Sequence, residues 1–225
     1  MINTEKELNE GGFMTMVETF DKSNFEYLCN HLAEKDDDLK LIVDTYGYPP
    51  LFARRPTFET LLHIILEQQV SLASAKAALN KLKEKIGTVL PEQLLLLTDI
   101  EMRACYFSRQ KIVYSRDLAK AIINKQLNLN ELMLSPDETV RTELKKIKGI
   151  GDWTTDVYMM MAMQRTDLFP LGDIALVNSM KTIKQLPKET DKDSLLIVAD
   201  KWRPYRTVAA FLLWHAYIKK RGIKL

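Results

Sequence analysis

The sequence predicts an all-α fold, on three observations. Apolar residues recur at three- and four-residue spacing along nearly the whole chain, which is the period of helices packed on a core. No segment shows the strict alternation of apolar and polar residues that a half-buried strand needs. The chain has 225 residues, 46% of them hydrophobic, so it can bury a core as one domain or as two small lobes.

Capping residues, prolines and glycines predict where the helices begin and end. Helices are expected after Ser23 and after Asp38, followed by a connection over residues 46–56 that contains three prolines. Thr57 and Ser71 have the side chains of N-caps, for a helix over 58–69 and for a second helix that ends at Gly87. Further helices are expected from Pro91, over 108–125, from Pro136 to Ile147, and over 174–183.

The first twenty residues are polar and contain Gly11-Gly12, so residues 1–20 are expected to form a flexible arm before a helical domain over 21–225. They lack the apolar stretch of a secretory leader, and the longest apolar run, Val208 to Ile218, is too short to span a bilayer. We therefore expect a protein that is not secreted and not in a membrane, located in the cytoplasm with the nucleoid or in the nucleus.

The charged residues are distributed unevenly. Residues 1–50 carry four basic and eleven acidic side chains, which leaves 28 basic and 19 acidic side chains for the remainder. A surplus of that size permits a face that neutralises nucleic-acid phosphates, but lysines that only solvate helix faces explain it equally well. The two cysteines, Cys29 and Cys105, are too few for a four-cysteine metal site and are expected to be buried thiols.

Residues 144–163, LKKIKGIGDWTTDVYMMMAM, predict two helices joined by the turn KGIGD. Glycines allow positive φ and let a phosphate oxygen approach the backbone, while Ile150 can fill the gap between the helices. The amides that begin the second helix form an anion site, and Lys145, Lys146 and Lys148 add positive charge beside it. A plain helical corner needs no ligand and is the alternative.

Downstream, the segment LFPLGDIALVNSMK places Asp173 after a Pro- and Gly-containing turn, at the start of a helix. An aspartate there is an ordinary N-cap, and that role is compatible with a catalytic one. The pattern of Leu144, Ile147, Gly149, Ile150 and Gly151 resembles the helix-hairpin-helix motif of DNA repair proteins, and its pairing with Asp173 resembles the helix-hairpin-helix DNA glycosylase superfamily.

This resemblance implies a compact two-lobed helical fold with the active-site cleft between the lobes and with the hairpin at 144–163. It implies Asp173 as the catalytic carboxylate and double-stranded DNA with damaged bases as the partner of a monomer. Members that also cut the strand carry a lysine where this chain has Trp153, so a monofunctional glycosylase without AP-lyase activity is expected.

Trp153-Thr154, the segment HIILEQQVSLASAKAAL over 63–79 and the segment KWRPYRTVAAFLLWHAY over 201–217 resemble the 3-methyladenine DNA glycosylase II branch. This branch excises alkylated bases by base flipping and hydrolysis of the N-glycosidic bond in base excision repair. The resemblance assigns the substrate-binding residues Trp153, Trp214, Gln68, Gln69, Val157 and Tyr158, with the two tryptophans as pocket walls and Gln69 as the wedge that fills the gap in the base stack.

The resemblance assigns DNA binding to Lys145, Lys146, Ile147, Lys148, Gly149, Ile150, Gly151, Thr154 and Ser71. No cofactor is expected and no metal is required, although the carbonyls of Lys145, Ile147 and Gly149 could hold a monovalent cation, as in relatives. Trp202 is expected to be a core residue. Three alternatives stay open, namely a non-catalytic helix-hairpin-helix DNA-binding protein, a glycosylase for an oxidised or deaminated base, and a purely structural helical bundle.

Overall fold

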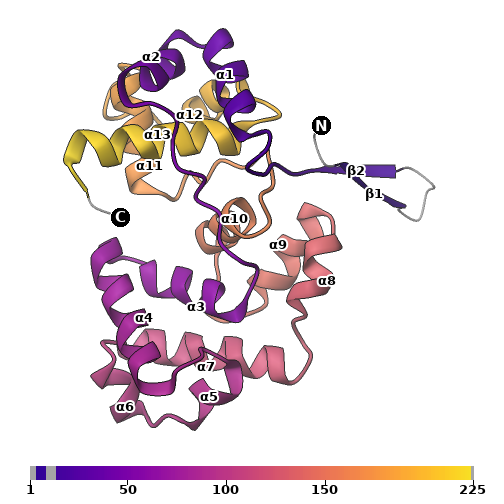
Figure 1. Cartoon of the computed structure of the whole chain (residues 1–225), viewed down its shortest axis with the longest axis vertical. Helices are drawn as coiled ribbons and strands as arrows, with labels where there is room; N and C mark the ends of the chain where they lie inside the picture. The colour runs from indigo at the N-terminus through magenta and orange to yellow at the C-terminus, as the bar shows by residue number, and fades with distance from the viewer. Residues whose placement is uncertain (1–3, 9–13, 224–225) are drawn as a thin grey trace. The chain divides into compact units, whose positions relative to one another are not determined.

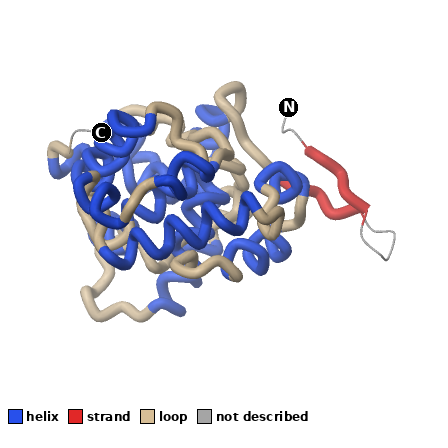
Figure 2. The backbone as a smooth tube through the Cα atoms, turned by 90° about the horizontal axis from the view of Figure 1, so that it is seen from below, coloured by secondary structure: helices blue, strands red, loops and turns tan. Residues whose placement is uncertain are grey.

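The structure, a computed structural model, describes residues 4–8 and 14–223. The chain divides into two compact units, one containing residues up to Ala53 and from Met159 onward, the other containing Arg54–Tyr158. Helices dominate both units (Figures 1 and 2), and the predicted all-α class is confirmed. None of the described helices combines the length and the hydropathy needed to cross a membrane.

The first unit is built around its last helix. It contains α1 (Phe25–Lys35), α2 (Asp37–Tyr46), α11 (Ile174–Ile183), α12 (Lys192–Asp200) and α13 (Arg206–Arg221). Every residue of α13 from Thr207 to Ala216 is buried, and α1, α2 and α11 pack against this helix. A helix that is buried on all sides reads as a continuous apolar run, which explains the long run that starts at Val208.

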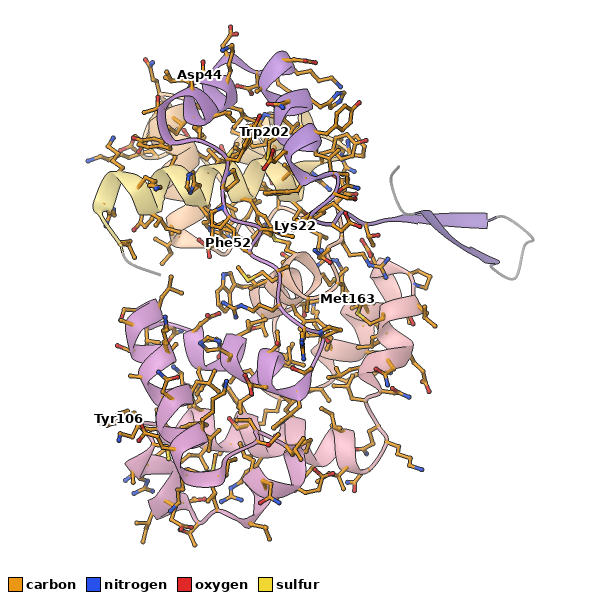
Figure 3. All side chains as sticks on the ribbon, in the orientation of Figure 1. Lys22, Asp44, Phe52, Tyr106, Met163 and Trp202 are labelled. Atoms are coloured by element: carbon orange, nitrogen blue, oxygen red, sulfur yellow. The ribbon has the colours of Figure 1, made fainter. Side chains whose placement is uncertain are left out.

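Asp36 ties three elements of this unit together. Its carboxylate caps α2, accepts a hydrogen bond from the Trp202 indole at 2.8 Å, and binds the Lys184 ammonium at 2.5 and 2.6 Å. Trp202 is 1% exposed, so its predicted place in the core is confirmed (Figure 3). Burial alone would raise the pKa of Asp36, but the hydrogen bonds from Lys184 and Trp202 outweigh it and hold that pKa below its ordinary value.

Replacing Asp36 with Asn is expected to lower the free energy of unfolding by about 2 kcal/mol at neutral pH, because Lys184 loses its negative partner and one of the two acceptor oxygens shared by Lys184 and Trp202 is replaced by a donor. The folded-state pKa of Asp36 is depressed, so its stabilisation is present above the unfolded pKa of about 4 and is lost as the pH falls through the folded value. Urea unfolding at pH 7 and at pH 3 measures this difference. If wild type and variant differ in unfolding free energy by the same amount at both pH values, this role for the charge is contradicted.

The second unit holds the remaining helices. These are α3 (Phe58–Glu67), α4 (Leu72–Ile86), α5 (Pro91–Leu96), α6 (Asp99–Ala104), α7 (Arg109–Ile123), α8 (Leu129–Leu134), α9 (Asp137–Lys145) and α10 (Asp152–Met161), whose last three residues belong to the first unit. The N-caps Thr57 and Ser71 are confirmed. The helix expected over 58–69 ends at Glu67, because Gln68 has a ψ of 123° that a helix does not allow, and Gln69 follows at a φ of +58°.

A two-stranded antiparallel ladder of β1 (Thr4–Leu8) and β2 (Met14–Glu18) lies within the segment expected to be an arm. The sequence pattern did not predict it, because backbone hydrogen bonds pair two strands without any alternation of apolar side chains. Gly11-Gly12 lies outside the described residues, and the flexibility of residues 1–20 stays a prediction. Cys29 and Cys105 are buried free thiols, as predicted, and burial raises the pKa of Cys29 to about 12.

Candidate DNA-binding hairpin and carboxylate site

The hairpin turn uses its two glycines differently. Gly149 has a φ of +90°, and a Cβ placed on it would lie 2.1 Å from the ring of Tyr114. Gly151 has no positive φ, and a Cβ placed there would meet nothing within 4 Å. Gly149 therefore supplies the left-handed turn, while Gly151 leaves its backbone open to a ligand.

The turn places the beginning of α10 at the surface of the second unit. Ile150 is 5% exposed, which agrees with its expected place in the gap between α9 and α10, and its amide donates to the Ile147 carbonyl at 3.0 Å. The Thr155 amide donates to the Gly151 carbonyl at 3.0 Å, so helical hydrogen bonding starts directly after the turn. The preceding amides of the first turn have no acceptor within the helix and are the groups that bind anions at helix starts.

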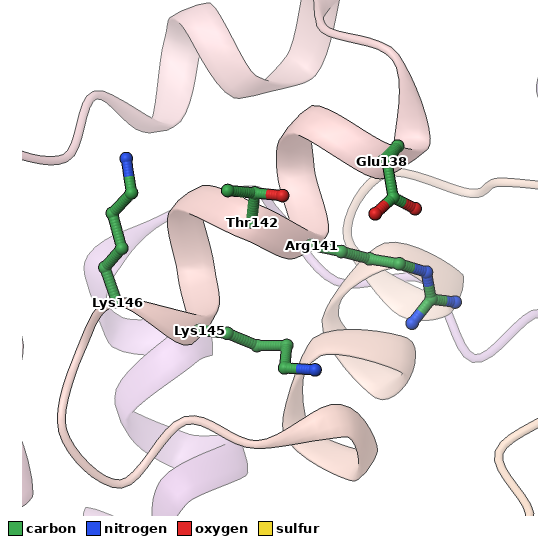
Figure 4. A pocket seen from close by; sticks show the side chains of 5 residues that line it. All are labelled: Glu138, Arg141, Thr142, Lys145 and Lys146. Atoms are coloured by element: carbon green, nitrogen blue, oxygen red, sulfur yellow. The ribbon is translucent and has the colours of Figure 1, made fainter.

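Basic side chains surround the hairpin, and several form ion pairs with acidic side chains. Lys145 binds Asp152 and Lys146 binds Glu143, each at 2.6 Å. Arg141 and Lys145 line a cavity of about 330 Å³ beside α9, and Figure 4 shows both side chains extending toward α10 while Lys146 points away. Exposed pairs of this kind contribute little to stability, so a DNA phosphate can replace their carboxylates at small cost.

Arg141 and Asp156 join the two helices of the hairpin. Their side chains meet at 2.6 Å, and Asp156 is 8% exposed. This ion pair was not predicted, since no local sequence pattern pairs residues on two different helices. Because Arg141 lies in α9 and Asp156 in α10, the pair links the two helices on either side of the turn.

The turn after α3 contacts the hairpin directly. The Gln68 side-chain amide donates to the Gly149 carbonyl and to the Thr154 hydroxyl, both at 2.8 Å. Gln69 is exposed and holds its φ of +58°. Ser71 is also exposed and caps α4 by accepting from the Ser74 amide at 3.2 Å. The structure thus brings together Gln68, Gly149 and Thr154, three of the residues that the sequence singled out.

The remaining pocket candidates of the second unit lie on α10. Trp153 is partly exposed, whereas Val157 is 2% exposed and Tyr158 is fully buried. Burial raises the pKa of the Tyr158 phenol far above its ordinary value.

Asp173 and Trp214 meet in the first unit. The Asp173 carboxylate caps α11 by accepting from the Leu176 amide at 2.8 Å, and the Trp214 indole donates to the same carboxylate oxygen at 3.2 Å. Asp173 is partly exposed, and Trp214 is 8% exposed. A carboxylate held by both a backbone amide and an indole has a fixed orientation, which is what electrostatic stabilisation of a developing charge requires.

An aromatic cluster that the sequence analysis missed supports this tryptophan. The rings of Phe211 and Trp214 are stacked with centroids 5.7 Å apart. Phe52, labelled in Figure 3, stands edge-on to Trp214 at 6.3 Å. Phe211 could have been found, because residues three apart on a helix are neighbours. No sequence signal points to Phe52, which comes from the connection after α2.

Two of the three carbonyls considered for a monovalent cation already accept a hydrogen bond. The Ile147 carbonyl accepts from Ile150, and the Gly149 carbonyl accepts from Gln68. A carbonyl oxygen has two lone pairs, so each retains one for a cation. Within the described part of the chain, no group of three or more His, Cys, Asp or Glu side chains is placed to hold a metal ion.

Comparison with known proteins identifies the family of this chain. Residues 62–204 match the family described as HhH-GPD superfamily base excision DNA repair protein. DNA-3-methyladenine glycosylase 1 of Schizosaccharomyces pombe is 30% identical over 192 residues, which are 82% of this chain and 84% of that protein.

Two solved structures of glycosylases are similar to this chain. The 3-methyladenine DNA glycosylase of Schizosaccharomyces pombe in complex with abasic DNA has a TM-score of 0.76 at 29% identity, covering 84% of this chain and 95% of that one. A DNA-3-methyladenine glycosidase of Bacillus halodurans has a TM-score of 0.69 at 29% identity, covering 91% and 94%. The chain therefore belongs to the HhH-GPD superfamily of base excision DNA repair proteins, on the branch of the 3-methyladenine DNA glycosylases.

Proposed function

We propose that this protein is a monofunctional DNA glycosylase of type II that excises alkylated bases, such as 3-methyladenine, from double-stranded DNA in base excision repair. The observation that carries the proposal is the Asp173 carboxylate, held by the α11 amide and by the Trp214 indole. Its relatives bear the name of this activity, and one of them is seen with abasic DNA. We expect a monomer that acts where the DNA is, in the cytoplasm or the nucleus.

Hydrolysis of the N-glycosidic bond of an alkylated base requires one carboxylate. When the N-glycosidic bond breaks, positive charge develops on the sugar, and a fixed carboxylate stabilises that transition state and can orient the attacking water. A base alkylated at a ring nitrogen, as 3-methyladenine is, carries a positive charge in DNA and leaves without being protonated first. Asp173 therefore needs no partner acid for such substrates, and its cap to Leu176 and bond to Trp214 keep it in one place during the reaction.

Recognition of the base and of the backbone is assigned to separate groups. Trp153 and Trp214 are each proposed to offer an indole face to the flipped base, because such a face attracts a flat cation. The substrate-binding role expected of Val157 and Tyr158 does not fit their burial, at 2% and 0% exposure. Gln69 enters the gap that the base leaves. Phosphate is bound by the open turn at Gly151, by the amides that begin α10 and by the neighbouring lysines. Any cation bound at the hairpin has the carbonyls of Lys145, Ile147 and Gly149 as its ligands.

The absence of strand cleavage is a separate expectation. Schiff-base chemistry needs an amine next to the sugar, and Trp153 stands where lyase members carry a lysine. We expect duplexes with an alkylated base to be cut only after alkali or heat is added, and we expect borohydride to trap no protein–DNA adduct. Cleavage without added base would overturn the monofunctional assignment and leave the glycosylase assignment intact.

Substrate choice is tested with a panel of duplex oligonucleotides, each containing one lesion. The expected result is release of 3-methyladenine and related alkylated bases, with 8-oxoguanine and uracil left in place. Faster release of an oxidised or deaminated base would move the protein to another substrate class. Tight binding without release of any base would indicate a DNA-binding protein, and no binding even at low salt would indicate a structural role.

A further inference from the structure

Gln68 directs its side chain to the hairpin, although its sequence position places it beside the wedge. Its amide nitrogen carries two hydrogens, and these are donated to the Gly149 carbonyl and to the Thr154 hydroxyl, each at 2.8 Å. The acceptors lie 81 and 86 residues away along the chain. Both donors of Gln68 are therefore used within the protein, which leaves none to read a base.

The orientation of this amide is fixed by its partners. Gly149 offers a carbonyl oxygen, which can only accept, so the nitrogen of Gln68 and not its oxygen must face it. Gln68 also ends α3, and its backbone amide donates to the Ile65 carbonyl at 3.3 Å. The residue is thus held at its backbone by a helix and at its side chain by the hairpin.

Other contacts hold the end of α3 but do not extend to the hairpin. The Lys111 ammonium donates to the Leu66 carbonyl, and Arg54 binds the Glu67 carboxylate through two hydrogen bonds at 2.7 and 3.1 Å. Both interactions tie α3 to parts of the second unit other than the turn at 146–151. Gln68 adds the link from this helix end to the phosphate-binding turn.

We propose that Gln68 is a positioning residue that fixes the wedge residue Gln69 relative to the hairpin. When the hairpin binds the DNA backbone, Gln69 is then already placed to enter the base stack. Gln69 follows Gln68 directly and is exposed at φ +58°, the left-handed conformation that commonly ends a helix, so its position depends on where the end of α3 is held. This proposal rests on the proposed function, and it replaces the lesion-facing role expected for Gln68.

The first test needs no DNA. Gln68→Glu keeps the size of the side chain but places an oxygen opposite the Gly149 carbonyl, so amide hydrogen exchange should become faster both at residues 68–71 and at 147–154. Gln93→Glu is the matched control, because it makes the same substitution at an exposed position of α5 in the second unit. Faster exchange at one segment only, or equal effects of the control, would overturn the link.

The second test is a double-mutant cycle on binding to duplex DNA with an abasic analogue. Gln69→Ala and Gln68→Ala are each expected to reduce the preference for abasic over undamaged DNA roughly tenfold. The first change removes the wedge, and the second leaves it out of position. The double variant should bind abasic DNA no more weakly than either single variant, because removing a wedge that is already misplaced costs no further binding. A Gln68→Ala protein with a normal thermal melt excludes misfolding as the cause.

If the loss of binding in the double variant equals the product of the two single losses, Gln68 and Gln69 act independently. That result would overturn the positioning role. A wild-type protein that does not prefer abasic DNA at all would instead overturn the proposed function. In that case the exchange experiment still decides whether Gln68 couples the two segments, so the two failures are distinguishable.

Discussion

Asp173→Asn is expected to reduce excision of 3-methyladenine by at least about 100-fold, because it removes the negative charge that stabilises the developing positive charge on the sugar. The fold should survive, since asparagine is as good an N-cap as aspartate and its side-chain oxygen can accept from the Leu176 amide and the Trp214 indole. Single-turnover excision from an alkylated duplex measures the loss. Binding to an abasic analogue should remain the same or become tighter.

Asp191→Asn is the matched control for this substitution. Asp191 caps α12 through the Ser194 amide at 2.8 Å, the same distance at which Asp173 caps α11. If catalysis depends on the charge of Asp173, the control should excise at the wild-type rate. Normal excision by Asp173→Asn would show that Asp173 is only a cap, and an equal loss in both variants would point to stability instead of chemistry.

Local sequence signals predicted the parts of this protein that depend on neighbouring residues. Asp173 follows a glycine and starts a helix over 174–183, and α11 has these bounds because the cap is built from adjacent residues. The hairpin turn was predicted for the same reason. The expected helix from Pro136 continues only to Lys145, since residues 146–151 form the turn that carries Gly149 at φ +90°.

Contacts between distant segments could not be predicted. Nothing in the neighbourhood of Gln68 indicates that its amide binds Gly149 and Thr154, and nothing in the sequence pairs Arg141 with Asp156. The six-residue helices α6 and α8 were missed because fewer than two turns cannot display a helical period. Tertiary packing therefore decides how the site residues are oriented, even where their identities follow from motifs.

Gly149→Ala is expected to lower the free energy of unfolding by about 2 to 4 kcal/mol and to abolish tight DNA binding. An alanine at φ +90° is strained, and its Cβ would lie 2.1 Å from the Tyr114 ring, so either the turn or the ring must move. Denaturant unfolding measures the first effect and binding to an abasic duplex the second. A variant of wild-type stability would show that the turn tolerates another conformation.

Gly151→Ala separates DNA contact from stability. Because Gly151 has no positive φ and a Cβ there meets nothing within 4 Å, its unfolding free energy should stay within about 0.5 kcal/mol of wild type. DNA binding should nevertheless weaken roughly tenfold, since a methyl group would stand where a phosphate oxygen approaches the α10 amides. If this variant binds DNA normally, phosphate does not enter the turn at Gly151, and the hairpin must hold DNA through its lysines alone.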